Sequence, residues 1–457
     1  MNRITVHFLG GAGTVTGSKF LLETEEINLM IDCGMFQGLK SLRELNWQDL
    51  AFDPSKINVV LLTHGHLDHT GYLPRLVKQG FSGRIIATAP TQAITKIILK
   101  DSAKINEEQA EEANREGYSK HEPAEAFYTI EDVQTTLNYF EAAPRDQWQE
   151  LSEHVRFQFR YNGHILGATF VELDIYGKRF VFSGDVGRPE DSLLNSPEKP
   201  EWADYLFLES TYGNKLHPTE DPSDVLVELV RENLLQQGTL IIPSFAVERL
   251  QVLMFLLWTL YRQNRIPNVP IFVDSPMGNN VLDVFAQFPE WHKLSPTDFG
   301  NMERHVEIIE SYRETWETID DPRSKIVIAG SGMVTGGRVL TYLQQLIDIA
   351  TTTILLVGFQ AEGTRGRDLL DGCHELKFKG KYYPVKAHVR HIQSLSAHAD
   401  QAEILDWLSE IKNIPERVFL IHGEPSAAQG LRVKLKDRFN WDVSVPKLGE
   451  TVEIITV

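Results

Sequence analysis

The chain has 457 residues, enough for two or three domains with buried cores, and its 42% hydrophobic content is typical of a globular protein. The formal net charge of −18 excludes a protein that coats nucleic acid through its overall charge, although a local group of cations can still bind phosphates. Two cysteines, Cys33 and Cys373, exclude a disulfide framework. We find no secretory signal and no apolar run of membrane length, and therefore expect a cytoplasmic protein with no membrane partner.

The first 211 residues are predicted to be rich in β-strands, with helices between them. Short apolar runs bounded by turn residues predict strands at 4–9, 19–23, 27–32, 57–62, 155–161, 169–176, 179–183 and 205–208. Longer periodic runs predict helices at 91–116 and 130–140. This mixture indicates packed sheets covered by helices.

A glycine-containing loop at residues 10–17 could be mistaken for a dinucleotide-binding loop. It connects two predicted strands and no helix follows it, so the βαβ context that such a loop requires is missing. We interpret it as a structural loop near the active site.

The segment 63–69 reads Thr-His-Gly-His-Leu-Asp-His and directly follows a predicted buried strand. His64 and His66 are two residues apart, so an extended loop can aim both at one point, and Asp68 and His69 can aim at a second point. Imidazole and carboxylate together suit zinc. Two adjacent ions would use all four groups.

Further polar residues follow apolar strands elsewhere in the chain. Asp32 ends a strand, where it could cap a turn or orient a histidine ligand, and the motif at 63–69 favours the second role. His164 lies between glycines, and the Asp185 carboxylate has two oxygens with which it could bridge two cations. Three more candidates are Glu209, His398 and His422.

The middle of the chain, residues 212–395, alternates strands with helices, which predicts βα units around a mainly parallel sheet. The strand and helix pairs are expected at 239–243 and 247–263, 269–273 and 278–288, 325–329 and 337–350, and 353–357 and 366–370. Residues 396–457 are expected to form a helix, a strand at 418–421, a second helix and two terminal strands.

Taken in order, these motifs resemble those of the metallo-β-lactamase superfamily and its β-CASP nucleases, the branch that contains ribonuclease J and the nuclease subunit of the cleavage and polyadenylation specificity factor. The segments 243–247, 331–338 and 358–364 are also similar to that branch. DNA-repair members have Val where this chain has His422, so the resemblance implies the RNA branch. One departure is Glu248, where relatives often have Gly.

The resemblance implies an α/β protein: a metallo-β-lactamase αββα sandwich built from residues 1–211 and 396–457, with a β-CASP domain inserted at 212–395. It implies one zinc held by His64, His66 and His164, and a second held by Asp68, His69 and His422. Asp185 and a hydroxide would bridge the two ions. His398 would be the general acid, oriented by Glu209, and substrate would contact Ser244, Arg249, Ser331, Arg338 and Ser396.

The function implied is a zinc-dependent ribonuclease that cuts single-stranded RNA, internally rather than from an end. Two other functions stay open: a thioesterase or lactonase of the same sandwich fold, and a non-catalytic scaffold of an RNA-processing complex. The oligomeric state is also open, a homodimer included. Residues 376–399 contain no Asp or Glu, so Lys381 and Lys386 belong either to a phosphate-binding surface or to an edge hairpin protected by lysines.

Overall fold

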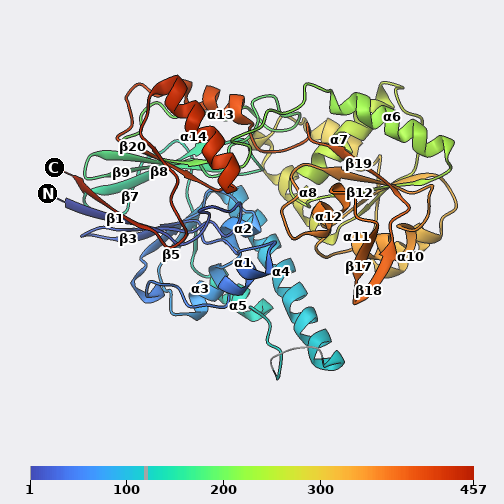
Figure 1. The fold of residues 1–457 in the computed structure, drawn as a ribbon, viewed down its shortest axis with the longest axis horizontal. Coiled ribbons are helices and arrows are strands. Elements are labelled where there is room, and N and C mark those ends of the chain that lie inside the picture. Colours follow the sequence, from blue (N-terminus) through green and yellow to red (C-terminus); the bar gives the residue numbers. More distant parts are fainter. Residues whose placement is uncertain (1, 118–121, 457) are drawn as a thin grey trace. The chain divides into compact units, whose positions relative to one another are not determined.

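The computed structural model describes residues 2–117 and 122–456 and divides into two compact units (Figure 1). The sandwich unit comprises Met1–Leu216 and His398–Val457, and the inserted unit comprises His217–Ala397. The domain boundaries predicted from the sequence, after residues 211 and 395, stay predictions. In the ranges described, no helix combines the length and apolar character needed to cross a membrane.

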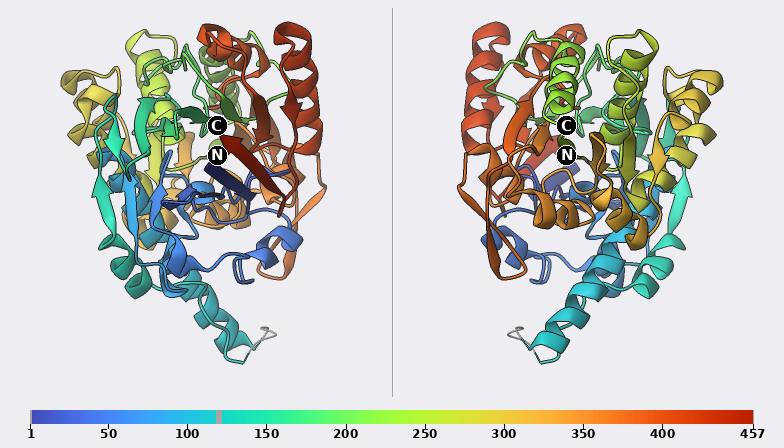
Figure 2. Two further views of the ribbon diagram at one scale, coloured as in Figure 1. Left: turned by 90° about the vertical axis from the view of Figure 1, so that its left-hand side faces the viewer. Right: turned by 90° about the vertical axis from the view of Figure 1, so that its right-hand side faces the viewer.

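The sandwich unit contains two seven-stranded sheets. The strands of the first, in spatial order, are β22 (Thr451–Thr456), β1 (Asn2–Phe8), β2 (Phe20–Glu23), β3 (Asn28–Ile31), β4 (Val59–Leu61), β5 (Arg84–Ala87) and β6 (Phe140–Ala142). The strands of the second are β21 (Val443–Ser444), β20 (Arg417–Ile421), β11 (Tyr205–Glu209), β10 (Lys178–Phe182), β9 (Thr169–Ile175), β8 (Val155–Tyr161) and β7 (Gln149–Glu150). Strands β1 and β22 pair antiparallel, so both ends of the chain lie in one sheet (Figure 2).

The two sheets pack face to face over an aromatic core. Phe182 and Phe207 of the second sheet stack with ring centroids 4.0 Å apart, and Phe207 also stacks on Phe419 at 4.9 Å. Phe8 and Phe20 of the first sheet reach this stack, at 6.0 Å from Phe207 and 6.1 Å from Phe182. All five rings are buried, as expected where aromatic side chains of facing sheets interdigitate.

Helices cover the two outer faces of the sandwich. On the first sheet lie α1 (Lys40–Leu45), α2 (Leu67–Thr70), α3 (Leu73–Lys78), α4 (Ala89–Glu116) and α5 (Ile130–Leu137), and on the second lie α13 (Gln401–Trp407) and α14 (Pro425–Phe439). Three short 3₁₀ turns complete the described helical elements: η1 (Pro54–Lys56), η2 (Pro289–Trp291) and η3 (Leu408–Glu410). The predicted αββα order is confirmed.

The long helix α4 shows how local sequence sets an element and ties it to the site. Thr88 accepts a hydrogen bond from the Thr91 backbone N–H and so caps the helix, and Gly117 ends it in the left-handed conformation with φ 66°. The Thr88 hydroxyl also donates to the Gly167 carbonyl at 2.9 Å. The helix start is therefore fastened to the turn that contains His164.

The inserted unit is built on a six-stranded sheet in which every neighbouring pair of strands is parallel. Its spatial order is β14 (Glu307–Ile308), β13 (Ile271–Asp274), β15 (Lys325–Ala329), β12 (Thr239–Pro243), β16 (Thr353–Val357) and β19 (His388–Ile392). Its helices are α6 (Pro222–Leu235), α7 (Arg249–Arg262), α8 (Pro276–Gln287), α9 (Pro296–Glu303), α10 (Tyr312–Asp320), α11 (Val339–Leu346) and α12 (Arg365–Leu370). The central strands are buried along nearly their whole length, as parallel strands covered on both faces must be.

Several short elements were not predicted. They include β5 and β6, the edge strand β19, and the helices α9 and α10. Each is brief, and its polar residues interrupt the periodicity on which the prediction depends. A hairpin of β17 (Glu375–Phe378) and β18 (Lys381–Pro384) lies in the lysine-rich stretch, where a hairpin was one of the two alternatives expected. The predicted parallel sheet of the middle region is confirmed.

Candidate metal centre

The candidate ligands lie in loops that follow strands of the two facing sheets. The segment 63–69 leaves β4, and Asp68 and His69 occupy the first turn of α2. His164 lies between β8 and β9, while Asp185 follows β10 and His422 follows β20. All of these residues belong to the sandwich unit, so its two sheets alone bring them together.

The first group of ligand atoms is formed by His64, His66, His164 and Asp185. His66 Nδ1 lies 3.1 Å from His64 Nε2 and 3.3 Å from His164 Nε2. Asp185 Oδ2 lies 3.5 Å from each of the other two nitrogens. Ligands about 2.0–2.1 Å from a tetrahedral zinc ion are separated by about 3.3 Å, so this group fits such an ion.

The second group is formed by Asp68, His69 and His422, and Asp185 faces it too. His422 Nε2 lies 3.4 Å from Asp68 Oδ2, and His69 Nε2 lies 3.3 Å from Asp185 Oδ1. Asp185 therefore turns one carboxylate oxygen to each group. Within the described ranges, His69 Nε2, His422 Nε2 and Asp185 Oδ1 are buried without a hydrogen bond, and a metal ion would satisfy all three.

The protonation equilibria also suit a cation. Burial lowers the pKa of His64 well below its ordinary range, and it lowers the pKa of His66 to about 4. Neutral imidazoles keep the lone pair that a metal requires. Burial would lower the pKa of His69 as well, but the Asp185 and Asp32 carboxylates raise it well above its ordinary value, so the surroundings of His69 are strongly anionic.

Asp32 lies behind the second group and holds His69. His69 Nδ1 is 2.7 Å from Asp32 Oδ2, which leaves Nε2 directed at the ligand group. Asp32 is itself held by Thr63, whose backbone N–H and hydroxyl each donate to the carboxylate at 2.8 Å. The same hydroxyl lies 3.0 Å from His64 Nδ1. Sequence reasoning assigned no role to Thr63, although it stands in the motif itself.

His398 and Glu209 form a pair beside Asp185. His398 Nδ1 lies 3.3 Å from Glu209 Oε1, and His398 Nε2 lies 3.9 Å from Asp185 Oδ2. Glu209 is fully buried and accepts from the backbone N–H groups of Val186 at 2.6 Å and Thr211 at 3.3 Å. Burial opposes a charge on His398, but the Glu209 and Asp185 carboxylates outweigh it and raise the pKa of His398 to about 9. This imidazole can therefore hold a proton next to the ligand groups at neutral pH.

Asn162 is a second supporting residue, after Thr63, to which sequence reasoning assigned no role. Asn162 Nδ2 donates to the backbone carbonyls of Ser183 at 2.7 Å and Asp185 at 2.5 Å, which fixes the loop that presents the Asp185 carboxylate. Its position two residues before His164 was the available signal.

The five residues expected to contact substrate all lie in the inserted unit. Ser244 and Ser396 are buried, and Arg249 is buried at the start of α7. The Ser331 hydroxyl is 3.1 Å from that of Thr335. Their roles toward substrate stay predictions.

The guanidinium of Arg338, the fifth of these residues, is already engaged inside the inserted unit. It donates to Thr315 Oγ1 at 2.6 Å, lies 3.7 Å from Asp274 Oδ1 and stacks 3.7 Å above the Tyr312 ring. A substrate contact by Arg338 stays a prediction.

Glu248 stands at the position where relatives often have Gly. Its φ is 66°, which lies in the left-handed region that favours glycine.

Comparison with known proteins identifies the family of the chain. Three family models match: the metallo-beta-lactamase superfamily over residues 12–241, the Beta-Casp domain over 250–369 and the Zn-dependent metallo-hydrolase RNA specificity domain over 382–446. A ribonuclease of Thermus thermophilus is 33% identical over 452 residues, which cover 97% of this chain and 99% of the relative. An RNase J-like protein of Methanocaldococcus jannaschii is 28% identical over 457 residues, covering 99% of this chain and 100% of the relative.

A crystal structure of an Enterococcus faecalis protein of unknown function has the same fold, with a TM-score of 0.55 at 14% identity over 99% of this chain and 100% of the other. The Beta-Casp match lies within the inserted unit, and the other two matches lie mostly in the sandwich unit on either side of it along the chain. The chain therefore belongs to the β-CASP family of the metallo-β-lactamase superfamily.

Proposed function

We propose that this protein is a zinc-dependent ribonuclease that hydrolyses phosphodiester bonds inside single-stranded RNA. The observation that supports this most directly is the pair of ligand groups that share Asp185, with His398 and Glu209 beside them. The relatives named as ribonucleases, which align along nearly the whole chain, support RNA as the substrate.

Two bound zinc ions would supply a water molecule of lowered pKa as nucleophile and would stabilise negative charge on the phosphoryl group. Low pKa values keep His64 and His66 neutral, so both can act as ligands at neutral pH. Asp185 turns one oxygen to each group and would hold the two ions at a constant separation. Asp68 would complete the second ligand set through Oδ2, next to His422.

His398 would protonate the leaving ribose oxygen. Its Nδ1 is directed at Glu209 and its Nε2 faces Asp185, so Nε2 is the atom that can deliver a proton at the centre. Glu209 accepts two backbone N–H groups and stays in place as the imidazole changes charge. Hydrolysis by this route leaves a 5′-phosphate and a 3′-hydroxyl.

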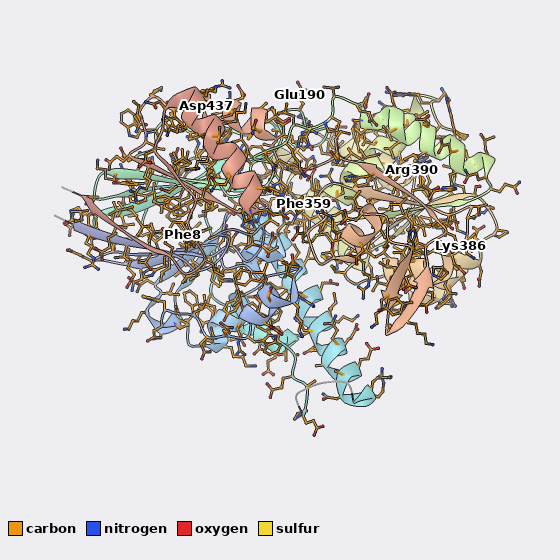
Figure 3. All side chains as sticks on the ribbon, viewed as in Figure 1. Phe8, Glu190, Phe359, Lys386, Arg390 and Asp437 are labelled. Carbon is orange, nitrogen blue, oxygen red and sulfur yellow. The ribbon has the colours of Figure 1, made fainter. Side chains whose placement is uncertain are left out.

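The lysine-rich stretch of the inserted unit would contact RNA phosphates. A phosphate-binding surface and a lysine-protected hairpin are both compatible with the structure, because Lys377 and Lys381 are exposed on the β17–β18 hairpin. Lys386, labelled in Figure 3, follows the hairpin and is also exposed. Lys377 Nζ lies 5.3 Å from the ring centroid of Tyr382, which is 61% exposed, so a cation and an aromatic face are offered together. Arg390 contributes less, because it lies 3.9 Å from Glu232.

The test uses the zinc-loaded protein and a 3′-labelled RNA whose 5′ end is blocked. Internal cuts that leave 5′-phosphates are expected, and the His398→Ala variant loaded with zinc is the control for contaminating nucleases. If the enzyme released only mononucleotides, and only from RNA with a free 5′ end, it would be a 5′-exonuclease and not an endonuclease. Efficient turnover of thioesters or lactones without RNA cleavage would overturn the proposal.

A further inference from the structure

The glycine-containing loop at residues 10–17 and the two residues after it lie against the second ligand group. We propose that the segment Gly10–Lys19, here called the clamp, positions the ligands of the second metal ion through its backbone, and that Lys19 is a positioning residue within it. This inference rests on the proposed two-metal centre.

The clamp holds His422 in an unfavourable conformation. The His422 backbone N–H donates to the Gly11 carbonyl at 2.6 Å, and the His422 carbonyl accepts from the Ser210 N–H and the Thr211 hydroxyl, each at 3.2 Å. His422 has φ 46°, a region that side chains larger than glycine rarely occupy. Such a conformation persists only where its surroundings impose it, and the Gly11 carbonyl is part of those surroundings.

The clamp also holds Asp68. The Ser18 N–H donates to the Asp68 carbonyl at 2.8 Å, and the Ser18 carbonyl accepts from the Gly34 N–H at 2.9 Å. Next to Gly34, the Cys33 N–H donates to the His69 carbonyl at 2.7 Å. The clamp is thus bonded directly to the backbones of Asp68 and His422, and reaches that of His69 through the turn at residues 32–34.

Lys19 is the last residue of the clamp, and its buried side chain supports the turn at residues 32–34. Its side chain is 2% exposed, its Nζ donates to the Gly34 carbonyl at 2.6 Å, and it lies 4.4 Å from the Phe36 ring centroid and 4.9 Å from that of Tyr72. A lysine is rarely buried unless its ammonium is paired. The turn that it braces contains Asp32, whose φ of 56° is also left-handed and whose carboxylate orients His69.

Backbone packs tightly against backbone at Gly10 and at Gly34. A Cβ at Gly34 would lie 1.5 Å from the Asp68 carbonyl oxygen, and a Cβ at Gly10 would lie 1.7 Å from the Gly17 carbonyl oxygen. Thr63, which contacts His64 and Asp32, and Asn162, which fixes the Asp185 loop, also support the centre, but neither belongs to the clamp. Loosening the clamp should therefore weaken the second metal ion selectively.

The decisive variant is Lys19→Met, which keeps an unbranched side chain between the two rings but removes the donor to Gly34. Lys325→Met is the matched control, because Lys325 is also 2% exposed and donates to the Asp321 carbonyl, but in the inserted unit. Zinc bound per chain is measured at rising concentrations of free zinc set by a chelator. We expect Lys19→Met to keep the first zinc and to bind the second about 10–100-fold more weakly, the usual effect of removing a group that supports a ligand. Lys325→Met should match wild type.

A second pair of variants covers the case in which Lys19→Met does not fold. Gly11→Ala places a Cβ 2.9 Å from Ser18 Oγ, whereas Gly13→Ala meets nothing within 4 Å, although both glycines have positive φ. Gly11→Ala alone should weaken the second zinc. The proposal would be overturned if the variants bound both zinc ions more weakly to the same degree. It would also be overturned if Lys19→Met and Gly11→Ala both bound zinc as wild type does. A single zinc in wild type would instead overturn the two-metal centre itself.

Discussion

Replacing Glu209 by Gln tests the proposed acid through its pH dependence. Gln has the shape of Glu, and its oxygen can still accept from the Val186 N–H at the Oε1 position, 2.6 Å away. The amide nitrogen would then face the Thr211 N–H, the longer contact at 3.3 Å. The substitution therefore removes the charge beside His398, keeps the size of the side chain, and loses the hydrogen bond from the Thr211 N–H.

The expected size of the effect follows from the distance between the two groups. Glu209 Oε1 lies 3.3 Å from His398 Nδ1 and is the main cause that raises the pKa of His398 to about 9. A carboxylate this close shifts a pKa by about 1–3 units, so its loss should lower the pKa of His398 by that amount. A fall of about 2 units would cut the protonated fraction at pH 9 from about one half to about one hundredth. Because an acid acts only while protonated, the alkaline limb of activity should move to lower pH.

The assay is kcat/KM for a 5′-blocked RNA between pH 6 and pH 10, with zinc content measured in the same samples. Glu172→Gln is the control, since Glu172 is also buried in the sandwich unit but is bonded to Gln158 and Arg179, away from the ligand groups. An alkaline limb that stays in place while the rate falls equally at every pH would refute the assignment of His398 as a charge-tuned acid.

Three further outcomes are expected. His398→Ala should keep near-normal zinc and lose about 10²–10⁴-fold in cleavage rate, whereas His422→Ala should lose metal; the opposite pattern in zinc analysis and kinetics would exchange ligand and acid. His69→Ala should lower zinc from about two equivalents to about one and abolish hydrolysis, and full activity with one metal would contradict the two-ion mechanism. Reversing Lys381 and Lys386 to Glu should raise KM for RNA and flatten the salt dependence, whose slope is about −0.7 per single-strand phosphate neutralised; unchanged slopes would remove the hairpin from the substrate surface.

Much of the fold could be predicted because apolar periodicity and chemistry-bearing motifs coincide along this chain. The segment 63–69 stands directly after β4, and Asp185 directly after β10, so both the strands and the residues at their ends could be read from one pattern. The edge strand β19 was missed because its burial alternates and its sequence, His-Val-Arg-His-Ile, contains three polar residues among five. A half-exposed strand of this kind lacks the continuous apolar run by which the central strands were found.

The supports of the centre could not be predicted for a different physical reason. The side chains that hold zinc in proteins are mainly histidine, cysteine and carboxylate, so candidate ligands are visible in the sequence. The Gly11 carbonyl that accepts from His422, and the Ser18 N–H that donates to Asp68, are backbone groups that almost any residue possesses. The sequence does show where the backbone is crowded, because residues 10 and 34 are glycine. At either position a Cβ would lie under 2 Å from a carbonyl oxygen. A glycine loop that fails the test for nucleotide binding is therefore informative once the ligands beside it are known, because its glycines mark where backbone must approach backbone for the ligands to meet.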